Sequence, residues 1–193
     1  MKVFLMTSPV DFAGEHELIE QLFESYPFSL QIRKPEYSES QMEKFLLGLP
    51  SEIREMSIVH GFKDLATSFS IAGYAEKTSF FQGNSLDSSL KNYAFCRKIE
   101  DLLSLPKELS GAFLYPIYDS LTEPSVKASI SAEYCVSDLP FPVFACGGVS
   151  EENFSELLKR GFAGAVVCGS VWNYADPLVA FKRITRMAFR LSQ

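Results

Sequence analysis

Two glycine-containing turns late in the chain have the composition of a phosphate-binding site. The apolar run Val143–Cys146 leads into the first turn, and the run Ala165–Cys168 leads into the second. Glycine has no side chain to keep an anion away from the backbone, so amide groups at such turns can approach a phosphate closely. Glycines also make tight turns that bind nothing, but two such turns after successive runs favour one shared phosphate site. The candidate phosphate-binding residues are Gly147, Gly148, Gly169 and Ser170.

Polar side chains also end two apolar runs early in the chain. Arg33 and Lys34 are adjacent, and alternation along a strand allows only one of them to point inward; we assign Arg33 to the interior together with Gln31. An inward arginine at a strand end is typical of anion binding. His60 ends another run, where it is either a diphosphate contact or acid–base group, or a hydrogen-bonded histidine at the rim.

These residues need elements that bring them together, and the sequence predicts eight strands. Most of the runs are continuously apolar without period-two alternation, which is typical of parallel strands buried on both faces. The predicted strands are Lys2–Ser8, Phe28–Arg33, Met56–His60, Ile71–Ala75, Asn92–Cys96, Gly111–Tyr118, Pro142–Gly147 and Gly164–Gly169.

Apolar residues at spacings of three and four predict helices between many of these runs. Two helices are indicated around Leu18–Phe23 and Met42–Leu49. A third begins at the N-cap Ser150 and stops at Gly161, and the last begins with Asp176 as its N-cap. Arg97 and Lys98 follow the fifth run; a solvated helix start is their commoner meaning, and a cationic contribution to a site is the alternative.

Strands and helices in this order predict an α/β fold, a small single-domain (β/α)₈ TIM barrel over residues 1–193. Residues 78–89 and 120–137 show no long helical pattern and are predicted to be loops with short turns, so some helices are shortened or missing. An open flavodoxin-like sheet is the alternative, and it requires several predicted strands to be wrong. In a barrel, the turns after strands seven and eight meet at one end.

Composition restricts the partners. The 193 residues include 18 basic and 24 acidic side chains, for a net charge of −6, which argues against nucleic acid as the main partner. No apolar stretch approaches the roughly 20 residues that cross a bilayer. The four cysteines have no C-x-x-C spacing and are expected to be reduced thiols of a cytoplasmic protein. We therefore expect small phosphorylated ligands and no membrane partner; a homo-oligomer is compatible with the sequence.

Residues 141–184 resemble the C-terminal third of the thiamin phosphate synthase and thiazole tautomerase family. The resemblance is carried by an ordered set of motifs: the Gly147–Ser150 turn with Asn153, then Gly161–Val167, and then Asp176–Pro177. Upstream, residues 31–33, 59–66 and 116–118 fall in the family's order on the predicted strands. The similarity spans nearly the whole chain but is dense only in the last third.

The resemblance implies a transferase of thiamin biosynthesis. Such a barrel couples a pyrimidine diphosphate to a thiazole phosphate, releases pyrophosphate with the help of Mg²⁺, and forms thiamin monophosphate. The thiazole nitrogen is the nucleophile, so the protein supplies positioning and charge rather than a covalent intermediate. The candidate catalytic residues are Arg33, which matches the family, and His60, which is chosen from its position at a strand end rather than from the resemblance. The candidate substrate-binding residues are Gln31, Lys34, Ser120, Thr122, Gly147, Gly148, Gly169 and Ser170; Lys34 is included as the substitute for a family lysine whose position is Pro35 here.

The sequence departs from the family at the metal. Where the family has Asn-Asp-Arg after strand three, this chain has His60 followed by glycine and phenylalanine, and Glu76 is the acid nearest to the second carboxylate position but is out of register. Mg²⁺ is therefore expected from the family, but its carboxylate ligands are not matched and no metal ligand is assigned. After strand six, Glu123 replaces the family's lysine, and Lys127 is the nearest substitute.

These departures leave three hypotheses. The first is a divergent thiamin phosphate synthase-like transferase. The second is a catalytically lapsed family member that binds a thiazole phosphate or a related ligand without turnover. The third is another reaction, such as an isomerisation, at the same phosphate anchor. Under all three, a bulky residue at Gly148 is expected to abolish ligand binding and to leave thermal stability mostly intact.

Overall fold

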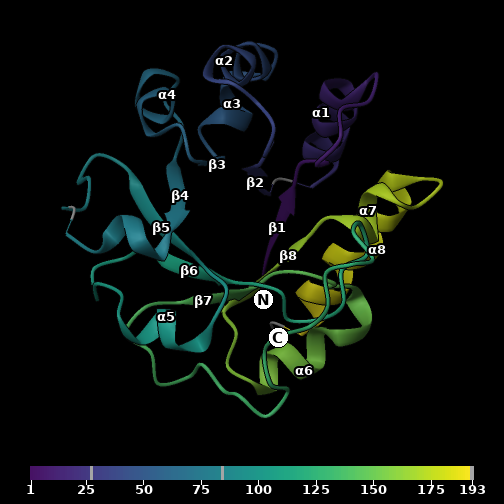
Figure 1. Cartoon of the computed structure of the whole chain (residues 1–193). Helices are drawn as coiled ribbons and strands as arrows, with labels where there is room; N and C mark the ends of the chain where they lie inside the picture. The colour runs from purple at the N-terminus through teal and green to yellow at the C-terminus, as the bar shows by residue number, and fades with distance from the viewer. Residues whose placement is uncertain (27, 84, 192–193) are drawn as a thin grey trace.

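Eight parallel strands close into a barrel in the order of the sequence (Figure 1). The structure, a computed structural model, describes residues 1–26, 28–83 and 85–191. Each strand pairs with its predecessor, and β8 pairs with β1 to close the sheet. The closed barrel confirms the predicted fold and rules out the open sheet. The strands are β1 Lys2–Met6, β2 Ser29–Ile32, β3 Ile58–His60, β4 Gly73–Lys77, β5 Lys91–Cys96, β6 Gly111–Leu114, β7 Val143–Ala145 and β8 Gly164–Val167.

Aromatic side chains fill the interior of the barrel. The ring of Phe4 lies 5.3 Å from that of Phe113 and 4.8 Å from that of Phe144, measured between ring centres. Tyr93 stacks on Phe113 at 5.3 Å. All four side chains are buried. The barrel is therefore a packed core, and ligands are confined to its end.

Helices surround the barrel in an incomplete ring (Figure 1). After β4 there is only a single 3₁₀ turn, and the described residues between β6 and β7 contain no helix, as predicted; residue 84, in the predicted loop 78–89, lies outside the described residues. The helices are α1 Glu15–Ser25, α2 Glu39–Leu47, α3 Ser51–Arg54, α4 Lys63–Ser68, α5 Ile99–Leu103, α6 Phe154–Lys159, α7 Gly169–Trp172 and α8 Pro177–Arg190, with 3₁₀ turns η1 Thr78–Phe81 and η2 Glu151–Asn153.

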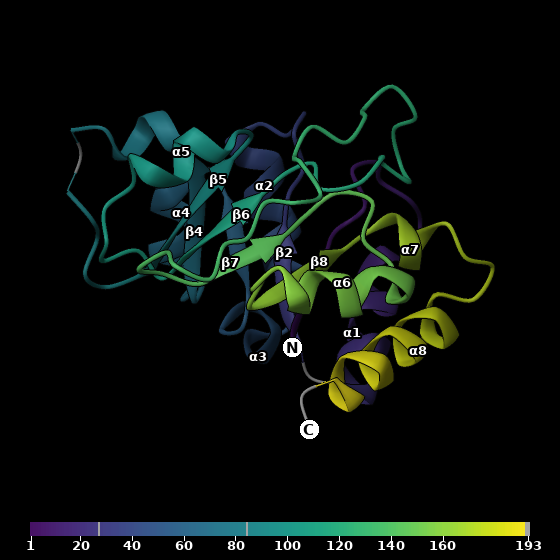
Figure 2. The same cartoon turned by 90° about the horizontal axis from the view of Figure 1, so that it is seen from below.

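The chain also closes on itself outside the barrel. Helix α8 packs beside α1, so the last helix covers the outside of the first βα unit (Figure 2). The amino group of Met1 donates to the carbonyl of Ala188 in α8 at 3.5 Å. No helix among the described residues is long and apolar enough to cross a membrane.

The predicted helix boundaries near the site are confirmed. Ser150 is the N-cap of η2, and its amide donates to Asn153 Oδ1 at 3.2 Å. Asp176 Oδ1 accepts from the amide of Val179 at 3.1 Å at the start of α8. Gly161 has φ +82°, in the left-handed region that glycine adopts readily, and it ends α6. These caps fix the turns that follow β7 and β8.

Several strands end earlier than predicted. Strand β6 ends at Leu114 rather than Tyr118, because Pro116 has no amide hydrogen to continue the ladder. Beyond it, the amides of Ile117 and Tyr118 still donate to the carbonyls of Cys146 and Gly147, at 2.9 and 3.1 Å. The segment after β6 is therefore tied to the first glycine turn.

Candidate functional site

A cavity of about 330 Å³ opens at the C-terminal ends of the strands, and we call it the glycine cavity. Both glycine turns line it, one after β7 and the other after β8. The two glycine turns therefore lie together at one end of the barrel, as the sequence predicts. Its wall includes Arg33, Phe95, Arg97, Tyr115, Ser120, Thr122, Glu123, Gly147, Gly148 and Gly169.

The first turn has its carbonyl groups occupied and an amide free. Gly147 and Gly148 have φ +89° and +66°, a left-handed backbone that favours glycine. The carbonyl of Gly147 accepts from Tyr118, and that of Gly148 accepts from Asn153 Nδ2 at 3.4 Å. The amide of Gly148 donates to no acceptor in the described part of the chain. The turn therefore presents a donor, rather than a carbonyl, for an anion.

The second turn has the same character. The carbonyl of Gly169 accepts from Asn173 at 3.1 Å, whereas the amides of Gly169 and Ser170 donate to no described residue. The hydroxyl of Ser170 is buried and has no hydrogen-bond partner among the described groups. Ser170 does not itself line the glycine cavity, in contrast to Gly169. Its amide and hydroxyl are thus unsatisfied donors behind the cavity wall.

Ser120 and Thr122 lie on the loop after β6 and line the same cavity. Ser120 Oγ accepts from the amides of Thr122 and Glu123 at 3.3 and 3.1 Å, which holds the loop in a turn. Glu123 places a carboxylate on this wall. Lys127, the proposed substitute cation, is paired with Asp119 at 3.1 Å and does not line the cavity.

A second cavity of about 650 Å³ adjoins the first, above β2 to β5, and we call it the His60 cavity. The two cavities share the side chains of Arg33, Phe95 and Arg97. Arg33 is partly buried and Arg97 is exposed. Within the described part of the chain neither guanidinium is paired with a carboxylate. The mouth of the barrel therefore holds two unneutralised cations between two spaces.

Gln31 and His60 form a pair beneath these arginines. His60 Nε2 and Gln31 Oε1 lie 2.9 Å apart, and Gln31 is fully buried. Burial, together with the nearby charge of Arg33, lowers the pKa of His60 to about 3. A neutral ring donates its Nε2 hydrogen to the glutamine oxygen. His60 therefore positions Gln31 and carries no charge at neutral pH, which makes it a poor proton donor.

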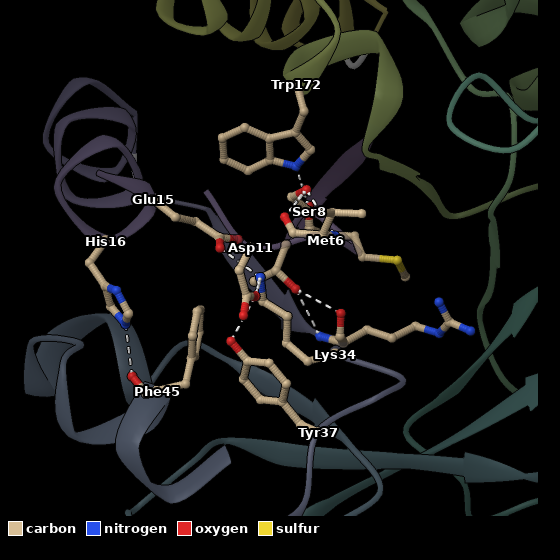
Figure 3. A network of polar contacts seen from close by, with 12 residues as sticks. Met6, Ser8, Asp11, Glu15, His16, Lys34, Tyr37, Phe45 and Trp172 are labelled. Atoms are coloured by element: carbon tan, nitrogen blue, oxygen red, sulfur yellow. Dashed lines mark hydrogen bonds and ion pairs between the residues drawn. The ribbon is translucent and has the colours of Figure 1, made fainter. Parts of the chain in front are cut away.

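Lys34 is committed to a network beside α1 (Figure 3). Its ammonium group lies 2.6 Å from Glu15 and 2.9 Å from Asp11, and the side chain is 1% exposed. Tyr37 donates to Asp11 at 2.7 Å, and these hydrogen bonds hold the pKa of Asp11 below its usual value. Two carboxylates thus neutralise Lys34, although it borders the His60 cavity.

The acids at the barrel mouth do not form a metal site. The described residues contain no group of three or more His, Cys, Asp or Glu side chains that could hold a metal ion. Of the described residues around the His60 cavity, Glu76 is the acid, and Arg33, Lys77 and Arg97 line the same cavity. A cavity with one carboxylate and several cations disfavours Mg²⁺, which is bound through carboxylates and substrate phosphates. The residues present do not fit the metal that the family resemblance implies.

Arg97, for which the sequence favoured a solvated helix start, is exposed and lines both cavities. It follows Tyr93 and Phe95 at intervals of two, so it continues the inward-facing register of β5 beyond the strand end. Its guanidinium carbon lies 5.6 Å from the centre of the Tyr115 ring, in the range of a cation–π contact. That alternation is the signal in the sequence that could have identified it.

Comparisons with known proteins agree with this geometry. No protein-family model matches the sequence, and no curated protein matches it. A thiamine phosphate pyrophosphorylase from Bacteroides thetaiotaomicron is 25% identical with a TM-score of 0.77, covering 98% of both chains. One from Pyrococcus furiosus is 17% identical with a TM-score of 0.78, covering 98% of this chain and 96% of that chain. A 3-hexulose-6-phosphate synthase follows at 15% identity and a TM-score of 0.67, covering 97% and 99%.

The closed eight-stranded barrel thus has counterparts among solved structures that cover almost the whole chain. The chain therefore has the same fold as two thiamine phosphate pyrophosphorylases of known structure.

Proposed function

We propose that the chain is a thiamin phosphate synthase-like transferase. A thiazole phosphate binds in the glycine cavity, and a pyrimidine diphosphate binds in the His60 cavity. The observation that carries the proposal is that the two cavities adjoin at the barrel mouth and share Arg33, Phe95 and Arg97. Two ligands in these spaces would have their reacting ends against the same three side chains.

The glycine cavity offers what a phosphate group requires. Its turns carry amides without acceptors, and their carbonyls are bonded elsewhere. A phosphate there would be held by backbone donors, which suits a protein of net charge −6. This arrangement supports the thiazole phosphate as the occupant.

The reaction needs a stabilised leaving group. The thiazole nitrogen forms a new C–N bond to the methylene carbon of the pyrimidine, and the bond from that carbon to the diphosphate oxygen breaks. Pyrophosphate leaves with the electron pair, so negative charge develops on the diphosphate side. Arg33 and Arg97 face that region as cations without carboxylate partners. Preorganised cations of this kind stabilise developing charge, and positioning of the two substrates supplies the rest.

The test is the reaction itself. Purified protein given both phosphorylated substrates is expected to form thiamin phosphate and pyrophosphate in equal amounts. Arg33→Gln is expected to lower kcat about 100-fold, because it removes a cation next to the leaving group. Arg186→Gln is the matched control, since Arg186 is exposed on α8, away from both cavities. Equal rates for Arg33→Gln and wild type would contradict the assigned role.

Binding without turnover is the second candidate function. The observation that favours it is the single acid among the described residues around the His60 cavity, which leaves the family's metal without a ligand set. Under this alternative, thiazole phosphate binds saturably while no thiamin phosphate forms at high protein concentration. That combination of results would overturn the transferase proposal and leave the phosphate anchor in place.

A further inference from the structure

The His60 cavity carries an unusual balance of charge for a chain that is acidic overall. Arg33, Lys77 and Arg97 line it, and within the described residues none of the three forms an ion pair. Glu76 is the acid among the described lining residues, and its Oε2 accepts from the amide of Lys77 at 3.3 Å. Unpaired cations grouped in a cavity attract anions and repel cations.

Aromatic rings, rather than carboxylates, hold the two guanidinium groups. The guanidinium carbon of Arg33 lies 6.0 Å from the centre of the Phe95 ring, and that of Arg97 lies 5.6 Å from the centre of the Tyr115 ring. The two rings are themselves 5.5 Å apart. Ring contacts orient the arginines and leave their charge unneutralised, so their N–H groups stay available to a ligand.

The remaining basic groups at this cavity do not compete for that role. His60 stays neutral, because burial holds its pKa at about 3. Lys34 is neutralised by Glu15 and Asp11. The charge that an anion would meet therefore comes from Arg33 and Arg97 at the wall shared with the glycine cavity, with Lys77 at the opposite side on β4.

We propose that the His60 cavity binds a diphosphate group directly through Arg33 and Arg97, without a divalent cation. Two planar guanidinium groups can each donate two parallel hydrogen bonds to phosphate oxygens and take over the neutralisation that a metal provides elsewhere. The proposal rests on the proposed function in assigning the diphosphate to this cavity. It differs from the family in the source of the positive charge.

The experiment is a calorimetric titration of the intact chain with sodium pyrophosphate, once with EDTA and once with magnesium chloride. Equal affinity in the two buffers is expected. Arg97→Gln is expected to weaken binding about tenfold, since it removes a charged hydrogen-bond donor. Lys98→Gln is the matched control: it removes the same charge from the next residue, which lines neither cavity, and is expected to bind as wild type does.

Glu76→Gln distinguishes binding by cations alone from binding through a metal, because the two hypotheses predict opposite changes in the affinity for pyrophosphate. Glu76 lines the His60 cavity and not the glycine cavity, so an effect there also locates the ligand. If cations alone bind pyrophosphate, removing the opposing carboxylate tightens binding about fivefold. If Glu76 holds a metal, the same change weakens binding in magnesium. Weaker binding of Glu76→Gln, or binding by wild type only with magnesium, would overturn the proposal.

Failure of the proposed function would look different. Metal-independent pyrophosphate binding without formation of thiamin phosphate would overturn the transferase and support this inference. Formation of thiamin phosphate that stops in EDTA would overturn the inference and support the transferase.

Discussion

The two cavities at the barrel mouth differ in the groups that they offer to an anion. Arg33 and Arg97 line both cavities, but the glycine cavity adds backbone donors: the turns after β7 and β8 carry amides without acceptors among the described residues, and Tyr118 and Asn153 occupy the carbonyls of the first turn. Side chains make the His60 cavity, where Arg33, Lys77 and Arg97 provide the charge. The sequence resembles the known family most densely around the first cavity and departs from it around the second.

This difference follows from the substitutions that a backbone site and a side-chain site each tolerate. A backbone site depends on left-handed glycines packed against neighbouring segments, so a substitution there disturbs the fold as well as the ligand. A side-chain site at the ends of strands can change its charges while the barrel is unaffected. The sequence thus keeps the glycine motifs of the family it resembles and lacks acids at the positions expected for that family's metal ligands. Three predictions test the contrast.

The largest effect is expected at Gly148. A Cβ there would collide with the carbonyl oxygen of Asp119 and lie 2.7 Å from Tyr118 Cβ, at a φ of +66° that alanine rarely adopts. Gly148→Ala is therefore expected to lower the free energy of unfolding by about 3 kcal/mol, from backbone strain and overpacking together. Urea denaturation measures it. The structure thus corrects the expectation that a larger residue at Gly148 leaves stability mostly intact.

Gly83→Ala provides the control for that prediction. Gly83 also has a left-handed backbone, with φ +99°, but a Cβ there would meet no atom of the described residues within 4 Å. Its substitution is expected to cost about 1 kcal/mol, from strain alone. Equal losses for the two variants would show that the packing of the first turn against the loop after β6 contributes nothing.

A smaller effect is expected at His60 and depends on pH. The pKa of this ring is about 3 in the folded chain and about 6.5 when unfolded, so between these values the unfolded state binds the extra proton. Stability is therefore lost as the pH falls below 6.5, by about 2 kcal/mol at pH 5. Urea denaturation at pH 7 and pH 5 measures the loss.

His60→Gln removes this titration and keeps a polar side chain beside Gln31. The other titrating groups remain in both proteins, so the variant is expected to lose less stability than wild type over the same interval. Parallel loss in the two proteins would mean that His60 is not held neutral by burial. The comparison of the two proteins thereby tests whether the His60 ring is buried away from water.

The sequence alone predicted the barrel because its signal is repeated. Eight apolar runs, helix caps such as Ser150 and Asp176, and two segments without helical pattern all agree with the structure. Strand ends were predicted less well, since hydrophobicity continues past the last ladder bond; Pro116 ended β6 before its apolar run ended. The meeting of the two glycine turns followed from strand order in a closed barrel.

The side chains of the site were harder to predict. Alternation placed Gln31 and Arg33 toward the barrel interior, in agreement with the pairing of Gln31 beside Met6 and with Arg33 in the cavity wall. Nothing near Lys34 in the sequence shows that Asp11 and Glu15 enclose it. Such pairs join segments whose distance depends on loop conformation. Arg97 was detectable from alternation along β5, but its helix-start position suggested a solvated residue. Which cations of the site are neutralised by carboxylates is therefore the part that the sequence could not predict.

The smallest effect on stability is expected at Arg97, where substitution is expected to weaken pyrophosphate binding. The side chain is exposed, has no carboxylate partner among the described residues and makes a contact with the Tyr115 ring. Arg97→Gln is expected to change the free energy of unfolding by less than about 0.5 kcal/mol, as is usual for exposed positions without buried partners. A loss as large as that of Gly148→Ala would mean that Arg97 supports the fold. Unchanged stability together with weakened pyrophosphate binding would distinguish the two cavities. The charges of the His60 cavity would then contribute to ligand binding alone, whereas the glycine turn would contribute to both ligand binding and folding.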